Sequence, residues 1–164
     1  METELVISHA GFPPLSARGC TQELVPLALG QFRRTVNGDL VFLGVQGKKY
    51  KTIISCEDKT SFASDELLPG MVIEVQCIQR LWQKINGPQV ILDRYPVEGS
   101  ICALSEARDL LKIICFNGKE VTLDNEHVGY LSYRPVLKMR VTRFSLTTDE
   151  WGGTAGWRLE LEEV

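Results

Sequence analysis

Residues 31–43 read QFRRTVNGDLVFL, which is two strand-like runs on either side of the pair Asn37-Gly38. Such a pair favours a type I′ hairpin turn, because asparagine tolerates a positive φ and glycine has no Cβ to clash. A turn at these two residues places Phe32 opposite Leu43. The second run is apolar on both faces and is predicted to be a central strand, whereas the first, with its arginines, is predicted at an edge.

The same signal occurs twice more, at Asn86-Gly87 and Asn117-Gly118, and Gly152-Gly153 makes a fourth break between strand-like runs. The sequence before the second pair, Met71–Trp82, is predicted to be one long strand that turns back into Gln89–Asp93. The chain is therefore predicted to be all-β, with antiparallel hairpins that form a barrel or a sandwich.

Two local predictions can be checked in detail. Ser105–Leu111 is a short helical candidate that Ser105 would cap. In the last hairpin, pairing Thr148 with Trp157 sets Phe144 opposite Leu161. In the run before this hairpin's loop, the apolar residues are first odd-numbered, up to Val141, and then even-numbered, from Phe144. This change predicts a bulge near Thr142–Arg143.

The length of 164 residues fits one ordinary domain or two small lobes that share a core. We expect an N-terminal β lobe at residues 1–98 and a C-terminal β lobe at residues 99–164, with one continuous domain as the alternative. The order of elements in the two parts is similar, so a distant internal duplication is also open.

Composition limits the classes of function. The formal net charge of −3 supplies no strong field for nucleic acid or an anionic membrane. The sequence has no apolar run near the ~20 residues of a membrane span. It starts with METE, which is acidic and unlike a signal peptide, so we expect folding in a cytoplasm.

The histidines and carboxylates that could act in catalysis or bind a metal are scattered along the sequence. His9 and His127 have no nucleophile or carboxylate arranged beside them, and Asp124 and Glu126 supply too few ligands for a metal. No phosphate-binding or dinucleotide fingerprint is present. We therefore expect no catalytic residues, no cofactor and no metal, and a protein that is not an enzyme.

The cysteines occur singly, at positions 20, 56, 77, 102 and 115. Cys56, Cys77 and Cys115 lie in strand-like runs, where a free thiol behaves as a small buried hydrophobe. We expect five reduced thiols, and a metal cluster assembled from distant cysteines is the alternative reading.

Nucleic-acid binding is the alternative function, because small antiparallel barrels such as the OB fold often bind single strands. Basic residues that could cluster beside the rings of Phe32 and Tyr50 are Arg33, Arg34, Lys48, Lys49 and Lys51. The acidic balance of the chain and its Glu160-Leu161-Glu162-Glu163 ending weigh against this alternative.

Five segments carry a resemblance to a known family: Tyr133–Thr142, Thr148–Gly153, Gly156–Glu163, Arg18–Gln22 and Arg33–Gly38. They resemble parts of tail structural proteins of long-tailed bacteriophages. The resemblance implies a β-rich virion subunit of the tail tip or baseplate, of the distal-tail or hub type. It also implies folding in the host cytoplasm and assembly with other tail proteins, as a homo-oligomeric ring. The resemblance assigns no binding role to any individual residue of this chain.

Three segments are predicted to make assembly contacts: the loop 57–66, the tip 151–153 and the N-terminal segment 11–14. Ordinary solvent-exposed loops are the alternative for each. The candidate contact residues in them are Phe12, Pro13, Phe62, Trp151, Gly152 and Gly153.

Overall fold

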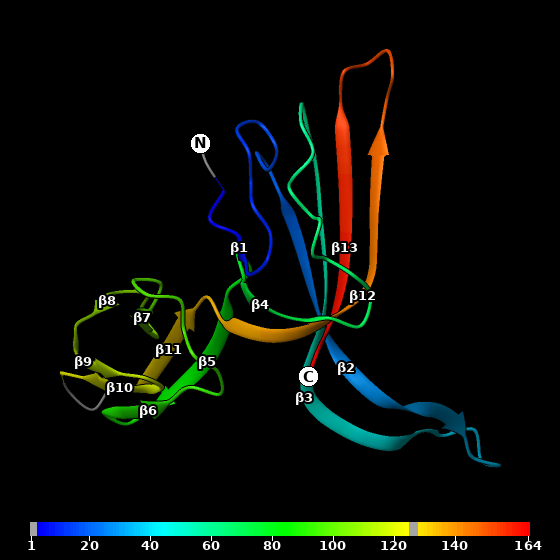
Figure 1. Ribbon diagram of the computed structural model, residues 1–164. Coiled ribbons are helices and arrows are strands. Elements are labelled where there is room, and N and C mark those ends of the chain that lie inside the picture. Colours follow the sequence, from blue (N-terminus) through cyan, green and yellow to red (C-terminus); the bar gives the residue numbers. More distant parts are fainter. Residues whose placement is uncertain (1–2, 125–127) are drawn as a thin grey trace.

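The computed structural model describes residues 3–124 and 128–164, and these residues form strands and no helix (Figure 1). The strands are β1 (Val6–Ile7), β2 (Thr21–Arg34), β3 (Leu40–Asp58), β4 (Val72–Gln76), β5 (Leu81–Asn86), β6 (Gln89–Ile91), β7 (Cys102–Ser105), β8 (Leu110–Leu111), β9 (Ile113–Asn117), β10 (Glu120–Leu123), β11 (Val128–Tyr133), β12 (Val136–Thr148) and β13 (Ala155–Glu163). Every pairing between them is antiparallel. The predicted all-β class is confirmed, and among the described residues the sheets are open and sandwich-like rather than a closed barrel.

The strands form three sheets. The largest has the order β1-β4-β12-β13-β3-β2, and the two smaller ones have the orders β6-β10-β9 and β5-β11-β7-β8. The large sheet uses both ends of the chain, and the small sheets use residues 81–133. Each sheet combines strands from before and after Gly99, so the boundary expected there does not coincide with a boundary between sheets.

The large sheet has one buried cluster of side chains, and the two small sheets share another. In the large sheet, inward-facing residues such as Ile54 and Leu159 pack under Phe62 and Leu67 of the loop after β3. Trp157 belongs to this cluster, and its indole Nε1 donates a hydrogen bond to the Ser16 carbonyl at 3.0 Å. The second cluster receives side chains from both small sheets, namely Ile85, Val90, Leu92, Ala103, Val121, Leu123, Leu131 and Tyr133.

The turn at Asn37-Gly38 exists, but its type and register differ from the prediction. Gly38 has φ +88°, whereas Asn37 does not have a positive φ. The Gly38 N–H donates to the Thr35 carbonyl and the Thr35 N–H donates to the Asp39 carbonyl, both at 2.9 Å. This is the three-residue loop with a positive-φ glycine that commonly replaces a two-residue turn. The extra residue shifts the register by one, so the predicted Phe32–Leu43 pair is wrong and Phe32 lies opposite Phe42.

The predicted long strand Met71–Trp82 is wrong, because the chain changes sheets within it. β4 ends at Gln76 and pairs with β12, whereas β5 begins at Leu81 and pairs with β11. The Asn86-Gly87 turn does not make a paired hairpin either, since β6 pairs with β10. Alternating sequence specifies that a segment is a strand, but it does not specify which sheet the strand joins.

The predicted helix at Ser105–Leu111 is wrong as well, and the segment is a small hairpin between β7 and β8. The Ser105 hydroxyl accepts the Asp109 N–H at 3.1 Å, and Arg108 has φ +69°. The hydroxyl expected to cap a helix therefore closes a turn, which is the competing role that serine side chains often take.

The pairing of β12 with β13 and the bulge between them are confirmed, since the register shifts between Val141 and Arg143. The predicted register is wrong by two residues, because Phe144 lies opposite Leu159 rather than Leu161. A shift of two preserves the faces, so the apolar residues still point inward. Phe144 is only half-buried and packs edge-on against Phe62, with 5.4 Å between ring centroids.

Alanine substitutions in the β12–β13 hairpin test the observed packing through their effect on the free energy of unfolding. Leu159→Ala removes a fully buried side chain and should lower the free energy of unfolding by about 2–5 kcal/mol. Arg143→Ala should cost less than about 1 kcal/mol, because Arg143 is exposed and its neighbour Glu160 already pairs with Lys51. Denaturant unfolding measures both, and equal losses would contradict this packing.

The segment before β2 is fastened to the end of β3 by an ion pair between Arg18 and Asp58. The Arg18 Nη2 atom lies 2.7 Å from Asp58 Oδ1, and the backbone N–H groups of Arg18 and Lys59 also donate to this carboxylate. The Arg18 guanidinium holds the pKa of Asp58 well below its usual range.

This ion pair should make the protein sensitive to acid. A carboxyl that binds its proton more weakly in the folded than in the unfolded chain stabilises the fold above its unfolded pKa of about 4. Thus the free energy of unfolding should fall as the pH is lowered from about 5 towards 2. Asp58→Asn should lower stability at neutral pH and flatten this decline. An unchanged stability–pH profile, followed by urea unfolding at each pH, would contradict the assignment.

Candidate assembly surface

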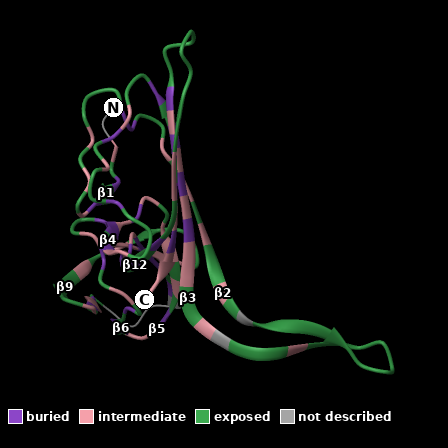
Figure 2. Ribbon diagram, turned by 45° about the vertical axis from the view of Figure 1, so that its right-hand side comes forward, coloured by how far each residue is buried: buried purple, intermediate pink, exposed green. Residues whose placement is uncertain are grey.

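The β2–β3 hairpin extends far beyond the body of the protein. β13 pairs with β3 only from Lys51 to Asp58, and residues 27–49 continue as a two-stranded projection, here called the arm. Figures 1 and 2 show the arm leaving the body, with most of its length exposed. β3 has 19 residues, well above the ordinary upper length of about 10 for a strand in a globular protein.

The arm bends away at its root because the ladder is interrupted there. The register shifts between Pro26 and Ala28, where Gly47–Lys49 of β3 lie opposite Leu27 alone. Extra residues on one strand increase the local bend and twist. Pro26 is tolerated because β2 is an edge strand of the sheet.

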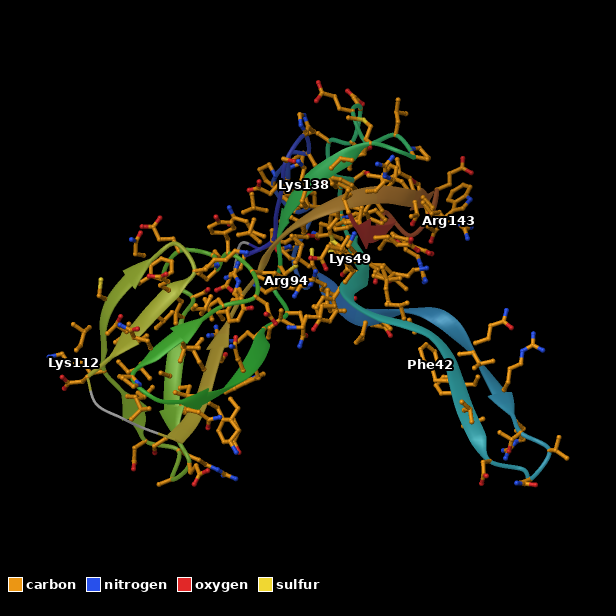
Figure 3. The ribbon with its side chains drawn as sticks, turned by 90° about the horizontal axis from the view of Figure 1, so that it is seen from below. Phe42, Lys49, Arg94, Lys112, Lys138 and Arg143 are labelled. Atoms are coloured by element: carbon orange, nitrogen blue, oxygen red, sulfur yellow. The ribbon has the colours of Figure 1, made fainter. Side chains whose placement is uncertain are left out.

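Arg94, in the segment that follows β6, fastens the root of the arm. Its guanidinium donates to both carboxylate oxygens of Glu163 at 2.8 and 2.9 Å, and also to the Lys48 carbonyl. It lies over the Tyr50 ring, 4.8 Å from the centroid, and Glu163 accepts the Tyr50 N–H at 2.8 Å. Figure 3 shows Arg94 and Lys49 at the root and Phe42 farther out on the arm.

The arm exposes large apolar side chains on both of its faces. Phe32 is 68% exposed, and its ring lies 5.1 Å from that of Phe42, the opposite residue. On the other face, Leu43 is 58% and Val45 is 71% exposed. At the end of the arm Val36 is fully exposed. Exposed apolar surface of this kind is typical of sites that bind a protein, a membrane or a ligand.

Gly30 and Gly44 lie opposite each other in the middle of the arm, and the packing there requires glycine at position 30. A Cβ on Gly30 would lie 2.6 Å from the Gly44 Cα and 2.7 Å from the Phe42 ring. No side chain fits in that space, so the Phe42 ring covers this part of the ladder.

The central position predicted for the second run of the first hairpin is wrong, because that run lies in the arm. In the body β3 lies between β2 and β13. In the arm, residues 40–46 pair with β2 only, and none of the residues the structure describes covers the other edge. A strand that is apolar on both faces is normally buried. Here the residues are those of a central strand, but the body covers neither face nor the free edge.

The predicted contact residues are divided between core and surface. Phe62 is 3% exposed and packs on Trp157 with ring centroids 4.5 Å apart, so its placement at a contact surface is wrong. Phe62 belongs to the connection between β3 and β4, and its ring lies in the buried cluster of the large sheet. Phe12 is half-buried and stacks on Phe62 at 5.7 Å. Pro13 is exposed, as are Trp151, at 92%, and its neighbours Gly152 and Gly153.

The basic residues of the nucleic-acid alternative do not form one cluster. Arg34 pairs with Leu40 at the end of the arm, and Lys49 lies nine residues along β3, on the order of 30 Å away. Lys51 is engaged by Glu160 at 3.5 Å, and the Tyr50 ring is covered by Arg94. The arm therefore has basic residues at both ends and an apolar middle.

The five cysteines are free thiols in different environments. Cys56 and Cys77 are buried as predicted, and burial raises the pKa of these thiols to about 12 and about 11, respectively. Cys115 lies in β9 but is exposed, because β9 is an edge strand, so its predicted burial is wrong. Within residues 3–124 and 128–164 no three metal-ligating side chains come together, and Glu126 and His127 lie outside these residues.

The burial of each cysteine predicts the order in which the thiols react with a thiol reagent. At near-neutral pH a maleimide should modify Cys115 first, whereas Cys56 and Cys77 should react only after denaturation, because thiolate is the reactive form. Mass spectrometry of peptides measures the order. Cys115→Ser should remove the fastest phase, and rapid modification of Cys56 in the native protein would contradict the described core.

Comparison with known proteins adds no assignment: no family model matches the chain, and no curated protein matches its sequence. The part of the chain that the structure describes also contains no helix of the length and apolarity needed to cross a membrane. The arm is thus the strongest functional feature. Sequence reasoning missed the arm as a candidate surface, although the apolar run on both faces of β3 is the signal that could have found it.

Proposed function

We propose that this protein is a structural subunit of a bacteriophage virion tail, in the tail tip or baseplate, that acts through protein–protein assembly. The observation that carries the proposal is the arm, whose apolar side chains and unpaired β3 edge are exposed. Folding in the host cytoplasm, other tail proteins as partners and a homo-oligomeric ring are parts of the same proposal.

The surface area of the chain supports an assembly role. It exposes 10655 Å². A compact monomer of 18.4 kDa is expected to expose about 8,200 Å². The excess of roughly 2,500 Å² exceeds the ~800 Å² that each partner contributes to a standard interface. Much of this surface lies on the arm, where it is apolar, so burial against another protein would stabilise it.

Assignment to a phage tail rests on the resembling segments. Three of them fall on β11, β12 and β13 and on the loop between the last two strands, and another covers the end of the arm. The all-β architecture is compatible with that resemblance. Binding to nucleic acid is less well supported, because the middle of the arm is apolar and the basic residues lie at its two ends.

Polar substitutions on the arm test the assembly role. The double variant Leu43→Ser/Val45→Ser should lose self-association or binding to other tail proteins, because it removes exposed apolar contact area without touching the cores. Leu68→Ser is the matched control, since Leu68 is equally exposed but lies on the body. Light scattering after size-exclusion chromatography and electron microscopy scored for rings measure the outcome.

The tail assignment needs a separate measurement. Peptides of this chain should be found by mass spectrometry in purified virions, and an antibody to it should label the tail end of the particles. A monomeric protein that stays absent from virions, with the arm variant indistinguishable from the control, would overturn the proposal.

A further inference from the structure

A groove of about 520 Å³ lies at the end of the large sheet opposite to the arm. Residues of β3, β12 and β13 line it, and Gly156, which has no side chain, leaves space between Glu57 and Thr147. Glu57 and Asp149 give the groove two carboxylates. Its single cationic lining residue, Arg158, is already paired with Glu160, with 3.3 Å between Nε and Oε1.

The rim of this groove is also apolar and acidic. The loop between β12 and β13 carries the exposed side chains of Glu150 and Trp151 directly after Asp149. The groove and its rim therefore combine carboxylates with apolar surface.

The end of the arm has the complementary composition. Val36 projects into solvent there, and Arg33 and Arg34 precede it. The end of the arm has these two basic side chains and one acidic side chain, Asp39, and the other two basic residues of the arm, Lys48 and Lys49, lie at its root. The arm as a whole is thus basic, whereas the whole chain has a net charge of −3. The rest of the molecule is therefore more acidic than the total indicates, and the arm is its basic projection.

A chain cannot place its own arm in its own groove. Leu40, the first residue of β3, lies at the end of the arm, and Asp58, the last, pairs with Ala155 beside the groove. The two are separated by the length of β3, roughly 60 Å if the strand were straight. Figure 1 shows the arm and the β12–β13 loop at opposite ends of the molecule.

We propose that the end of the arm of one copy seats in the groove of a second copy of this chain. Arg33 and Arg34 point to opposite faces of the arm, so they bring positive charge to both sides of the seated end. Their acidic neighbours are then Glu57 in the groove and Glu150 on its rim, and Val36 packs against Trp151. This inference rests on the proposed function, because it takes the arm as the assembly contact and names its partner. Since the two surfaces differ, the contact is head-to-tail, and repetition gives a closed ring or an open filament.

Charge reversal on each side of the contact tests this partner. Arg33→Glu/Arg34→Glu sets acidic residues against the acidic groove, and Glu57→Arg/Glu150→Arg sets basic residues against the basic arm. Each variant alone should self-associate at least about tenfold more weakly than the natural chain, because like charges meet across the interface. A mixture of the two should assemble again, since each arm then meets a groove of opposite charge.

The control for the arm variant is Lys112→Glu/Lys138→Glu, which changes the net charge by the same amount and in the same direction at exposed sites on the body. It should assemble like the natural chain. Circular dichroism and thermal melting of each variant show that the fold is retained, so loss of assembly reports the contact rather than unfolding. Sedimentation velocity measures the association of single variants and of the mixture.

A disulfide crosslink gives a second, independent readout. In a Cys115→Ser background, Val36→Cys and Trp151→Cys placed on separate copies should form an intermolecular disulfide under mild oxidation. Val36→Cys combined with Leu68→Cys, a residue on another part of the body, should not. Loss of assembly in each single variant, its recovery on mixing and the 36–151 crosslink together support the inference.

Other outcomes overturn it and leave the proposed function standing. If the charge-reversed variants assemble like the natural chain, or if mixing restores nothing, the arm does not seat in this groove. If the natural chain stays monomeric but is incorporated into virions through its arm, the partner is another tail protein. Absence from virions would overturn the proposed function itself.

Discussion

β13 is nine residues long and its neighbour β3 is nineteen, and the organisation of the molecule depends on this mismatch. Where β13 covers β3, the sheet has six strands and a buried core. Where β13 ends, at Glu163, its carboxylate binds Arg94 and the Tyr50 N–H. One side chain at the end of β13 thus holds the segment between β6 and β7 and fixes the root of the arm. The body therefore ends, and the arm begins, at the point where β13 ends.

The sequence predicts the class of structure well and its connections poorly. Positive φ at Gly38, Gly87 and Gly118 confirms that backbone turns occur where the Asn-Gly pairs place them. The registers could not be obtained in this way, because one additional loop residue at Gly38 changes every pair along the arm. Sheet membership was also hidden, since the alternating pattern before and after residues 77–80 is the same although the chain passes between sheets.

The candidate surface shows a different limit of sequence reasoning. Phe62 was placed on a loop correctly, but the burial of that loop depends on contacts with Trp157 and Phe144, which are distant in sequence. In β3 the pattern correctly indicated a strand suited to burial on both faces, yet the single chain does not bury it. Such a conflict between local pattern and monomer structure is expected at a functional surface, where the missing neighbour belongs to another molecule.

The Gly30–Gly44 pair has a mechanical consequence for any structure built through the arm. At that level a single backbone ladder joins the strands, the two paired residues have no side chains, and the Phe42 ring packs over them. The arm is therefore more compliant there than the six-stranded body. A joint of this kind fixes which surfaces meet while leaving the angle between subunits adjustable. The curvature of a larger particle would then be set by its neighbouring components rather than encoded in this chain alone.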